Sequence, residues 1–481
     1  MRASFALALL APSLASCSSV DPATRDALRD ITITRVSLQQ GVDLTLVKDG
    51  AEILPPYASP IAERAGMLRV EFTPSFSDIR AVTAQLVLDY GEGVTTLKEV
   101  VNQVDGSNIG QSTNFELDAN DLKTNTKFRV RFVPGPTGSV TGSGSPAEYP
   151  PKAAPPAEFR LQRSGTLRIK LIPIRYDTDG SGRIADSGPT HVEELKKRFL
   201  DLYPVTSVDI TVGDPLPWSQ KIGRNGEGHD DLLDEIAALR AQESPDFDVY
   251  YLGLFATTAT YAEYCGHQCT TGLSVRATNA RSAESRVSVA VGYAETRSME
   301  SSLHEIGHAH GRAHAPCGGA GNPDASFPHE KGTLGAEGYS ALAKKFYDPA
   351  KNFDFMSYCD PAWVSDYTFG ALLTRVQELT TMEAPQHGLV VPKIMRMLQV
   401  RPSGETKWGR HLRLAGRPNG EPIGISLTAQ DGQKSIVTGY KYDYLHSSGG
   451  TVWVPSAEVS GKRVELVFND LKIELDGADS R

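Results

Sequence analysis

The segment HEIGHAHGRAH contains four histidines and one glutamate, and three of the histidines are spaced so that they could bind and use a metal ion together with the glutamate. His304 and His308 are four residues apart, so on an α-helix their imidazoles lie one turn apart on the same face and can bind one ion. Glu305 follows the first histidine and cannot point at the same position, so we expect it to act as general base on water at the metal. Gly311 can adopt the left-handed conformation that ends a helix and turns the chain back, which brings His314 to the ion as third ligand.

Three protein ligands leave one coordination position open, which distinguishes a catalytic zinc from a structural zinc closed by a fourth side chain. Zinc in such a site lowers the pKa of water to about 7 and polarises a carbonyl group. Glu305 can then take a proton and pass it to the leaving amine. The sequence therefore predicts amide hydrolysis at one Zn²⁺ ion. A degenerate, non-catalytic domain that has kept its ligands is the alternative, and the retained glutamate argues against it.

The segment 304–314 matches H-E-x-x-H-x-x-G-x-x-H throughout, and in this the chain resembles the metzincin clan of zinc endopeptidases. Residues 354–359, DFMSYC, resemble the Met-turn of that clan, which implies that Met356 forms a hydrophobic floor beneath the three imidazoles. The resemblance also implies that Tyr358 ligates the resting metal or donates its hydroxyl to the developing oxyanion. A buried structural tyrosine is the other interpretation. The resemblance covers about residues 160–385 and implies a protein or glycoprotein substrate.

Two further motifs give weaker expectations. Residues 177–183, DTDGSGR, begin like a calcium-binding loop, but Gly188 stands at the twelfth position, where a glutamate is expected. A strand-to-helix turn is therefore preferred, and Ca²⁺ is the second possibility. His310 lies inside the zinc motif but points away from the ligands by helical phase, so we expect it to face solvent.

The elements that must position the zinc motif follow from hydrophobic patterns. Between residues 159 and 388 strands alternate with helices, which is typical of an α/β domain. Thr190 is expected to open the first helix through a capping box with Glu193, and Ser298 to cap the helix that carries the motif. The expected strands are 167–174, 208–212, 249–254 and 287–291, and the other expected helices are 190–203 and 229–242.

Segments with a period of two flank this region. They predict a small antiparallel β-sandwich within residues 18–148, followed by a Gly, Ser and Pro-rich linker over 134–156, and a C-terminal β domain over 389–481. Examples are residues 31–36, 68–72, 84–88, 128–133, 424–427 and 463–468. The predicted fold class is thus an α/β (α+β) metzincin-like catalytic domain with a mixed sheet and an active-site helix, flanked by N-terminal and C-terminal β-sandwich domains.

Length and charge limit the classes of function. A chain of 481 residues is too long for one core and predicts several domains. The net charge of -9 and the lack of a run of Lys and Arg residues argue against a nucleic-acid partner.

Residues 1–17 predict a lipoprotein signal peptide. Arg2 precedes an apolar stretch that is too short to span a bilayer permanently. The segment LASC resembles a bacterial lipobox, which implies that Cys17 is lipidated and becomes the first mature residue. Ser18 is not the aspartate of inner-membrane retention, so the resemblance implies an exported protein, lipid-anchored at the outer membrane or cell surface of a bacterium, with membrane contact through the anchor only. A plain signal peptide with an incidental cysteine is the alternative.

The other four cysteines can form two disulfides in three pairings. An oxidising compartment favours disulfides over metal binding by these residues. Cys265 and Cys269 bracket three residues, while Cys317 follows the third histidine and Cys359 follows the Met-turn. We therefore expect pairing of Cys265 with Cys269 and of Cys317 with Cys359. The second pair does not match the astacin or serralysin patterns, so the resemblance does not assign one metzincin family.

Two other classes of function fit the sequence. One is a non-catalytic surface-binding lipoprotein or adhesin with a protease-like scaffold. The other is a zinc hydrolase that acts on a non-peptide amide. Zinc content and the cleavage of protein and small-amide substrates separate these classes from the endopeptidase.

Overall fold

A computed structural model of the protein describes residues 26–136, 138–266, 269–277, 279–382, 393–401, 403–414, 418, 420–444 and 449–477. Strands account for 41% and helices for 18% of the structure, so the protein is mostly β-sheet, arranged in several sheets. The predicted signal peptide and Cys17 lie outside the described residues. Among the described residues, no helix combines the length and the apolar character needed to cross a membrane.

By compactness the chain forms two units. Unit 1 contains the described part of Met1–Arg35 together with Val70–Phe115 and Lys127–Ala157, and unit 2 contains Val36–Arg69, Glu116–Thr126 and Glu158–Arg481. The boundaries fall inside strands β1 (Ile31–Gln39) and β4 (Gly66–Pro74). The N-terminal segment 18–148 therefore contributes to both units, and the three predicted domains stay a prediction.

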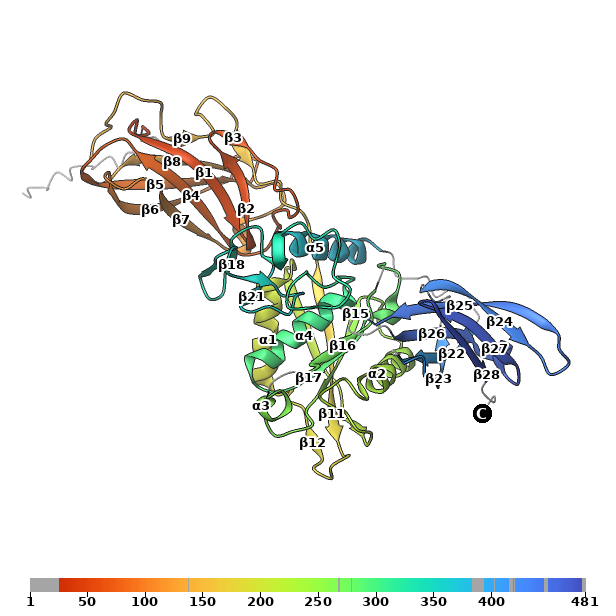
Figure 1. The fold of residues 1–481 in the computed structure, drawn as a ribbon. Coiled ribbons are helices and arrows are strands. Elements are labelled where there is room, and N and C mark those ends of the chain that lie inside the picture. Colours follow the sequence, from red (N-terminus) through yellow and green to blue (C-terminus); the bar gives the residue numbers. More distant parts are fainter. Residues whose placement is uncertain are drawn as a thin grey trace, which may run out of the picture. The chain divides into compact units, whose positions relative to one another are not determined.

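Unit 1 contains antiparallel strands. The central strand β5 (Ile79–Asp89) pairs with β6 (Thr95–Asp105) and with β8 (Lys127–Pro134), and β9 (Glu148–Tyr149) pairs with β8. Strands β1, β4 and β7 (Gln111–Leu117) lie side by side in another sheet. The strands of both sheets are labelled in Figure 1. The rings of Phe72 on β4 and Phe132 on β8, with centroids 4.6 Å apart, bring the two sheets into contact.

The prediction that residues 134–156 form a free linker is wrong. The N–H of Arg29 donates to the carbonyl of Thr141, and the N–H of Ala147 donates to the carbonyl of Leu28. The segment therefore runs back along the start of unit 1, because its backbone groups find partners there instead of water.

The sheet that positions the zinc motif is in unit 2 and is mixed. Strands β11 (Thr166–Tyr176), β15 (Val249–Phe255) and β17 (Val287–Val291) run parallel in that order, and β16 (Gly272–Ser274) closes the edge antiparallel to β17. Strands β15 and β17 are almost continuously buried, because helices cover both of their faces. Strand β11 also pairs with β12 (Arg183–Ile184), β13 (Ser207–Val212) and β14 (Leu216–Trp218).

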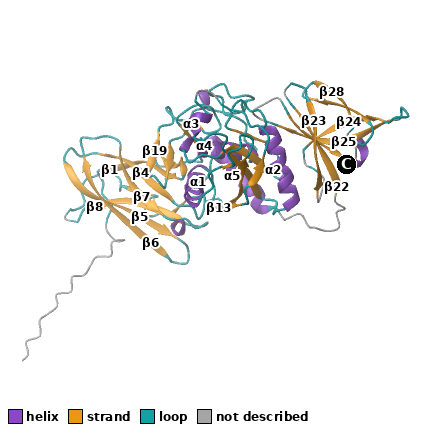
Figure 2. Cartoon of the chain, turned by 90° about the horizontal axis from the view of Figure 1, so that it is seen from below, coloured by secondary structure: helices purple, strands orange, loops and turns teal. Residues whose placement is uncertain are grey.

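Helices α2 (His229–Glu243) and α4 (Thr296–Ala309) cover opposite faces of this sheet. Successive strand residues point to opposite faces. The hydroxyl of Ser288 on β17 donates to the carbonyl of Glu305, so this face of the sheet meets α4. The next residue, Val289, pairs with Gly253, where an added Cβ would lie 2.9 Å from Ile236, so the opposite face meets α2. The other helices are α1 (Pro189–Leu202), α3 (Tyr261–Tyr264) and α5 (Asp366–Thr381), and Figure 2 shows the helices in purple among the more numerous strands.

Both predicted helix caps are wrong. Helix α1 follows Gly188, which makes no side-chain cap, so Thr190 lies inside the first turn and forms no capping box. Helix α4 begins after Glu295, and Ser298 is also inside its first turn. The Ser298 hydroxyl instead donates to the carbonyl of Val291 at 2.8 Å, which fixes the start of α4 to the end of β17.

Part of the N-terminal segment belongs to the core of unit 2. Arg64 is buried, and its guanidinium donates to four carbonyls at the end of α1, those of Leu200, Asp201, Tyr203 and Val205. The indole N–H of Trp363 donates to the carbonyl of Gly41 at 2.7 Å. Strand β2 (Gly41–Lys48) also pairs with β18 (Gly338–Ser340), which pairs with β19 (Lys345–Tyr347).

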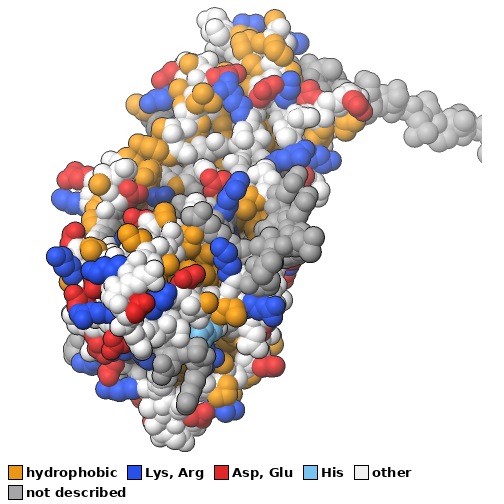
Figure 3. Space-filling view, turned by 90° about the vertical axis from the view of Figure 1, so that its right-hand side faces the viewer, with side chains coloured by type: hydrophobic (Ala, Val, Ile, Leu, Met, Phe, Trp, Pro, Cys, Tyr) orange, Lys and Arg blue, Asp and Glu red, His pale blue; other side chains and the backbone are white. Residues whose placement is uncertain are grey.

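The C-terminal strands form one seven-stranded sheet in the order β23-β22-β26-β25-β24-β27-β28, and not the predicted two-sheet sandwich. A single apolar cluster that includes Val400, Ile425 and Phe468 fills its interior. Figure 3 shows basic and acidic side chains intermixed on one face of the molecule. The strands are β22 (Lys393–Val400), β23 (Thr406–Leu414), β24 (Glu421–Thr428), β25 (Lys434–Asp443), β26 (Gly450–Pro455), β27 (Arg463–Phe468) and β28 (Leu471–Asp476). Other short elements are β3 (Ala51–Glu52), β10 (Ala157–Glu158), β20 (Phe353–Asp354), β21 (Ala362–Trp363) and α6 (Ser456–Val459).

Candidate metal centre

The structure brings the three predicted ligand histidines together. The Nε2 atoms of His304 and His308 on α4 are 3.0 Å apart, and the ring of His314 lies 4.7 Å from that of His308 between centroids. One nitrogen from each of the three residues falls within 4.8 Å of the other two. Two nitrogens bound to one tetrahedral zinc at about 2.0–2.1 Å lie about 3.4 Å apart, so this arrangement is close to that of a zinc site. Across the described part of the chain, no other group of three His, Cys, Asp or Glu side chains could hold a metal ion.

The hydrogen bonds of the far ring nitrogens fix which nitrogen faces the centre. The Nδ1 atoms of His304, His308 and His314 contact the carbonyls of Phe355, Arg312 and Gly321 at 2.8, 2.7 and 2.5 Å. A carbonyl oxygen only accepts, so each Nδ1 carries the hydrogen, and each neutral ring directs the Nε2 lone pair inward. Converging lone pairs repel one another unless a cation lies between them. The donor set therefore fits a divalent metal that prefers imidazole, such as zinc.

The turn after α4 brings in the third histidine, as predicted. Gly311 has φ +93°, and an added Cβ would lie 2.7 Å from the carbonyl of Ala277. The N–H of Arg312 donates back to the carbonyl of Gly307, which closes the last turn of the helix. The N–H of Asp324 donates to the carbonyl of His314 at 2.8 Å, so the following loop holds the ligand from its other side.

Glu305 is 2% exposed and lies beside the edge strand β16. An added Cβ on Gly272 would be 2.6 Å from a carboxylate oxygen of Glu305, so only glycine leaves room for this side chain. Burial raises the pKa of Glu305 to about 8, and the neighbouring His304 acts in the opposite direction. A cation at the triad would favour the ionised carboxylate and lower this raised pKa.

Met356 is fully buried beneath α4. An added Cβ on Gly307 would lie 2.4 Å from its sulfur atom, so the side chain packs directly against the helix backbone between the two ligand histidines. Asp354 fixes this turn: its carboxylate accepts from the N–H of Met356 at 2.8 Å and from the N–H of Ser365 at 3.0 Å. Sequence reasoning missed Asp354, because its role depends on a partner eleven residues away at the start of α5.

Tyr358 lies beside the third ligand. Its hydroxyl is 3.3 Å from Nε2 of His314, and its ring is 5.0 Å from that of His314 between centroids. The side chain is 47% exposed, so it is not the buried structural tyrosine of the alternative interpretation. Although the residue as a whole is about half exposed, partial burial of its hydroxyl and the nearby charge of Glu305 raise the pKa of Tyr358 above its ordinary value, so it remains a hydrogen-bond donor at neutral pH.

Both expected disulfides are present. Cys265 pairs with Cys269 and Cys317 with Cys359, with Cα–Cα distances of 5.3 and 5.7 Å. The second bridge joins the loop that follows His314 to the residue that follows Tyr358.

The prediction that His310 faces solvent is wrong. The side chain is 2% exposed and stacks on Tyr250 of β15 with ring centroids 4.3 Å apart. Its Nδ1 contacts the carbonyl of Ile306 at 3.1 Å. Helical phase correctly separated His310 from the ligands, but the sheet lies on that side of α4 and not solvent.

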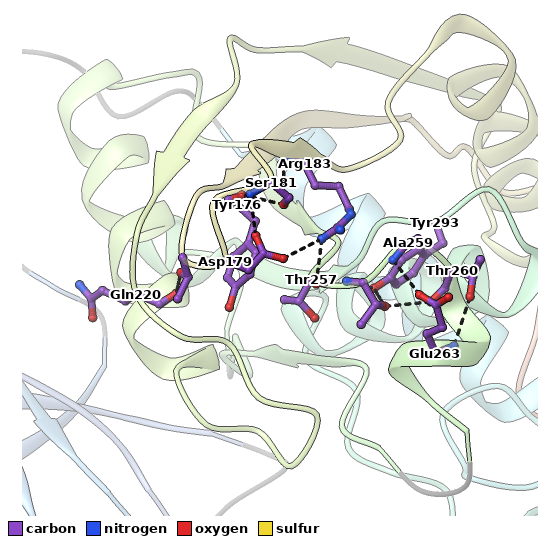
Figure 4. Close-up of polar contacts among 12 residues, drawn as sticks. Tyr176, Asp179, Ser181, Arg183, Gln220, Thr257, Ala259, Thr260, Glu263 and Tyr293 are labelled. Atoms are coloured by element: carbon purple, nitrogen blue, oxygen red, sulfur yellow. Dashed lines mark hydrogen bonds and ion pairs between the residues drawn. The ribbon is translucent and has the colours of Figure 1, made fainter.

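Residues 177–182 form the turn between β11 and β12, and the Ca²⁺ site that was the second possibility here stays a prediction. Figure 4 shows Arg183 directed at Asp179, with 3.4 Å between the charged groups, and its guanidinium also donates to the carbonyl of Thr257 at 2.8 Å. The carboxylate of Asp177 accepts from Arg175 at 3.2 Å. Each of these two carboxylates therefore has an arginine as an ion-pair partner.

A polar cluster that sequence reasoning missed supports the loop after His314. The carboxylate of Asp324 accepts from Arg312 at 3.2 Å and from the hydroxyl of Tyr367 at 3.0 Å. The guanidinium of Arg312 also lies over the ring of Tyr367, 5.1 Å from its centroid. The only sequence signal was the position of Arg312 within the zinc motif, and its partners come from two later segments.

No protein-family model matches the chain, and no curated protein sequence is significantly similar to it.

Proposed function

We propose that this chain is a zinc-dependent endopeptidase of the metzincin type, with a mixed-sheet catalytic domain in unit 2. The observation that carries the proposal is the convergence of three Nε2 lone pairs on one point, with Glu305 and Tyr358 beside it. The proposed substrate is a peptide bond of a protein or glycoprotein. The proposed location, from the segment that ends at Cys17, is a lipid anchor at the bacterial outer membrane or surface.

The histidine triad would hold zinc, which supplies Lewis acidity and lowers the pKa of water. Glu305 takes a proton from the attacking water and delivers it to the amine that leaves. Its position against Gly272 holds the carboxylate at one side of the triad, so the proton moves over a short, fixed path. The phenol of Tyr358 donates a hydrogen bond to the oxygen on which negative charge develops.

The test uses the full chain with a stoichiometric zinc supply. We expect it to bind about one zinc ion, to cleave a denatured protein, and to lose this activity when a chelator removes the metal. Glu305→Gln keeps the shape of the side chain but cannot accept the proton, so it should bind zinc normally and lose activity by at least about 100-fold. Unchanged cleavage by this variant would refute the assignment of the base.

Two outcomes favour the rival classes. Zinc binding without cleavage of any peptide or small amide, in protein that is folded by circular dichroism, favours a surface-binding protein with a protease-like scaffold. Cleavage of small amides but not of peptides favours a hydrolase of another substrate class. A peptide library as substrate resolves this choice and gives the preferred residues around the cleaved bond.

A further inference from the structure

The Cys317–Cys359 bridge joins two segments that each carry a residue of the metal centre. His314 lies three residues before Cys317, and Tyr358 lies directly before Cys359. The two ligands on α4 do not depend on this connection, because the helix itself sets their spacing. The third ligand and Tyr358 lie outside the helix and need another support.

Backbone hydrogen bonds pair the same two segments. The N–H of Ala315 donates to the carbonyl of Met356 at 3.0 Å, and the N–H of Tyr358 donates to the carbonyl of Cys317 at 3.2 Å. The Cys317–Cys359 disulfide adds a covalent link between the two segments, one residue after Tyr358. Rotation of either segment would therefore have to break both hydrogen bonds and strain the bridge.

Gly318 completes the contact. Its φ is +72°, and an added Cβ would lie 2.7 Å from the carbonyl carbon, the Cβ and the carbonyl oxygen of Tyr358. The chain that leaves Cys317 thus passes directly against the backbone of Tyr358. Gly318 therefore contacts Tyr358 at its backbone, while the hydroxyl at the other end of the side chain lies 3.3 Å from Nε2 of His314.

We infer that the Cys317–Cys359 bridge, together with Gly318, is a positioning element of the metal centre that holds Tyr358 in register with the third ligand. The inference rests on the proposed function for its effect on turnover. Its effect on metal binding is independent of any activity. Cysteines 317 and 359 touch neither substrate nor metal in this scheme and act through Tyr358 and His314.

The first experiment compares the paired substitution Cys317→Ser/Cys359→Ser with Tyr358→Phe and with the combination of all three, in the full zinc-loaded chain. We expect the paired substitution to lower kcat by about 10-fold to 100-fold and to change KM little. Because it acts through Tyr358, it should lower kcat by less than about threefold when Tyr358→Phe is already present. Effects that multiply in the combined variant would overturn the inference.

The second measurement is the zinc dissociation constant, obtained by competition with a chromogenic chelator. The paired substitution should raise it by about tenfold or more, since the loop that carries His314 loses its covalent support. The control is Cys265→Ser/Cys269→Ser, which removes the other bridge and should leave the constant unchanged. An equal change in both variants, or none in the first, would overturn the inference. If the wild-type chain binds zinc but cleaves nothing, the proposed function fails while this measurement still decides about the bridge.

A third comparison avoids the loss of a disulfide. Gly318→Ala and Gly319→Ala place a Cβ at φ +72° and φ +74°, but only the first meets Tyr358, since nothing lies within 4 Å at Gly319. Backbone strain is therefore matched between the two. Gly318→Ala should lower kcat by about 10-fold, as expected for a disturbed supporting residue, and Gly319→Ala should not. Equal kcat values would contradict the role of Gly318.

Discussion

Gly311 combines two constraints at the point where the chain leaves α4. Its φ of +93° is unfavourable for any residue with a Cβ, and that Cβ would overlap the carbonyl of Ala277, a backbone atom that cannot rotate away. The position is therefore both a conformational and a packing requirement.

We predict that Gly311→Ala lowers the free energy of unfolding by roughly 2–4 kcal/mol, from backbone strain and overlap together. Gly180→Ala is the control, because Gly180 has φ +75° and open space around it, so it should lose only the strain, about 1 kcal/mol. Urea unfolding of both variants measures the difference. Equal losses would show that the contact with Ala277 contributes nothing.

Asp234 on α2 is a second residue with a measurable consequence. Burial raises the pKa of Asp234 well above its ordinary value, and the neighbouring carboxylates of Asp230 and Asp231 act in the same direction. The hydroxyl of Tyr444 donates to it at 3.3 Å, and the positive charge of Lys407 opposes the shift. The folded state therefore binds a proton more tightly than the unfolded chain does.

A raised pKa of this kind stabilises the fold below about pH 4, and that contribution is lost as pH rises through the folded-state pKa. Asp234→Asn cannot ionise and keeps an acceptor for Tyr444. We predict that the variant gains stability relative to the wild-type protein as pH is raised from about 4 to about 8. Unfolding free energies at both ends of this range test the sign, and a constant difference would contradict it.

At the scale of elements, the two bridges should differ in their effect on stability. Cys317 and Cys359 are 42 residues apart in sequence, whereas Cys265 and Cys269 are four apart. Chain-entropy arguments give about 4 kcal/mol for the longer loop and about 2 kcal/mol for the shorter one. Chemical unfolding of the two paired serine variants should show this order, and the reverse order would mean that native-state effects dominate.

Elements with regular patterns were predictable from the sequence, and their ends were less so. Strand β17 spans Val287–Val291 as predicted, because a short run rich in β-branched residues strongly favours a strand. The caps at Thr190 and Ser298 were wrong because tertiary contacts, such as the bond from Ser298 to Val291, set where the helices start. The apparent linker over 134–156 was wrong because composition does not reveal backbone partners.

The residues of the candidate site also fall into those that the sequence could predict and those that it could not. Spacing along one helix was enough to predict that His304 and His308 come together, since helical geometry is local. Gly272, Asp354 and Asp324 could not be found, because each acts on a residue from another element. Their roles depend on the fold and not on any pattern near them.

At the scale of the whole molecule, each of the two compact units is built from segments that are not consecutive in the sequence. Residues 36–69 and 116–126 belong to unit 2, although the residues between them belong to unit 1. Arg64, with its four bonds to the end of α1, comes from the first of these segments.

A truncated protein that starts at residue 158 would keep every candidate ligand and the whole mixed sheet, yet it would lack the buried guanidinium that donates to those four carbonyls. Leaving such groups buried without partners costs about 1–3 kcal/mol each. We therefore expect the truncation to be unstable or aggregated, whereas a chain that retains residues 26–157 should fold, as differential scanning fluorimetry can check. The smallest autonomous piece of this protein that contains the candidate metal centre is then longer than the histidine motif and the sheet indicate, and attempts to express it must begin before β2.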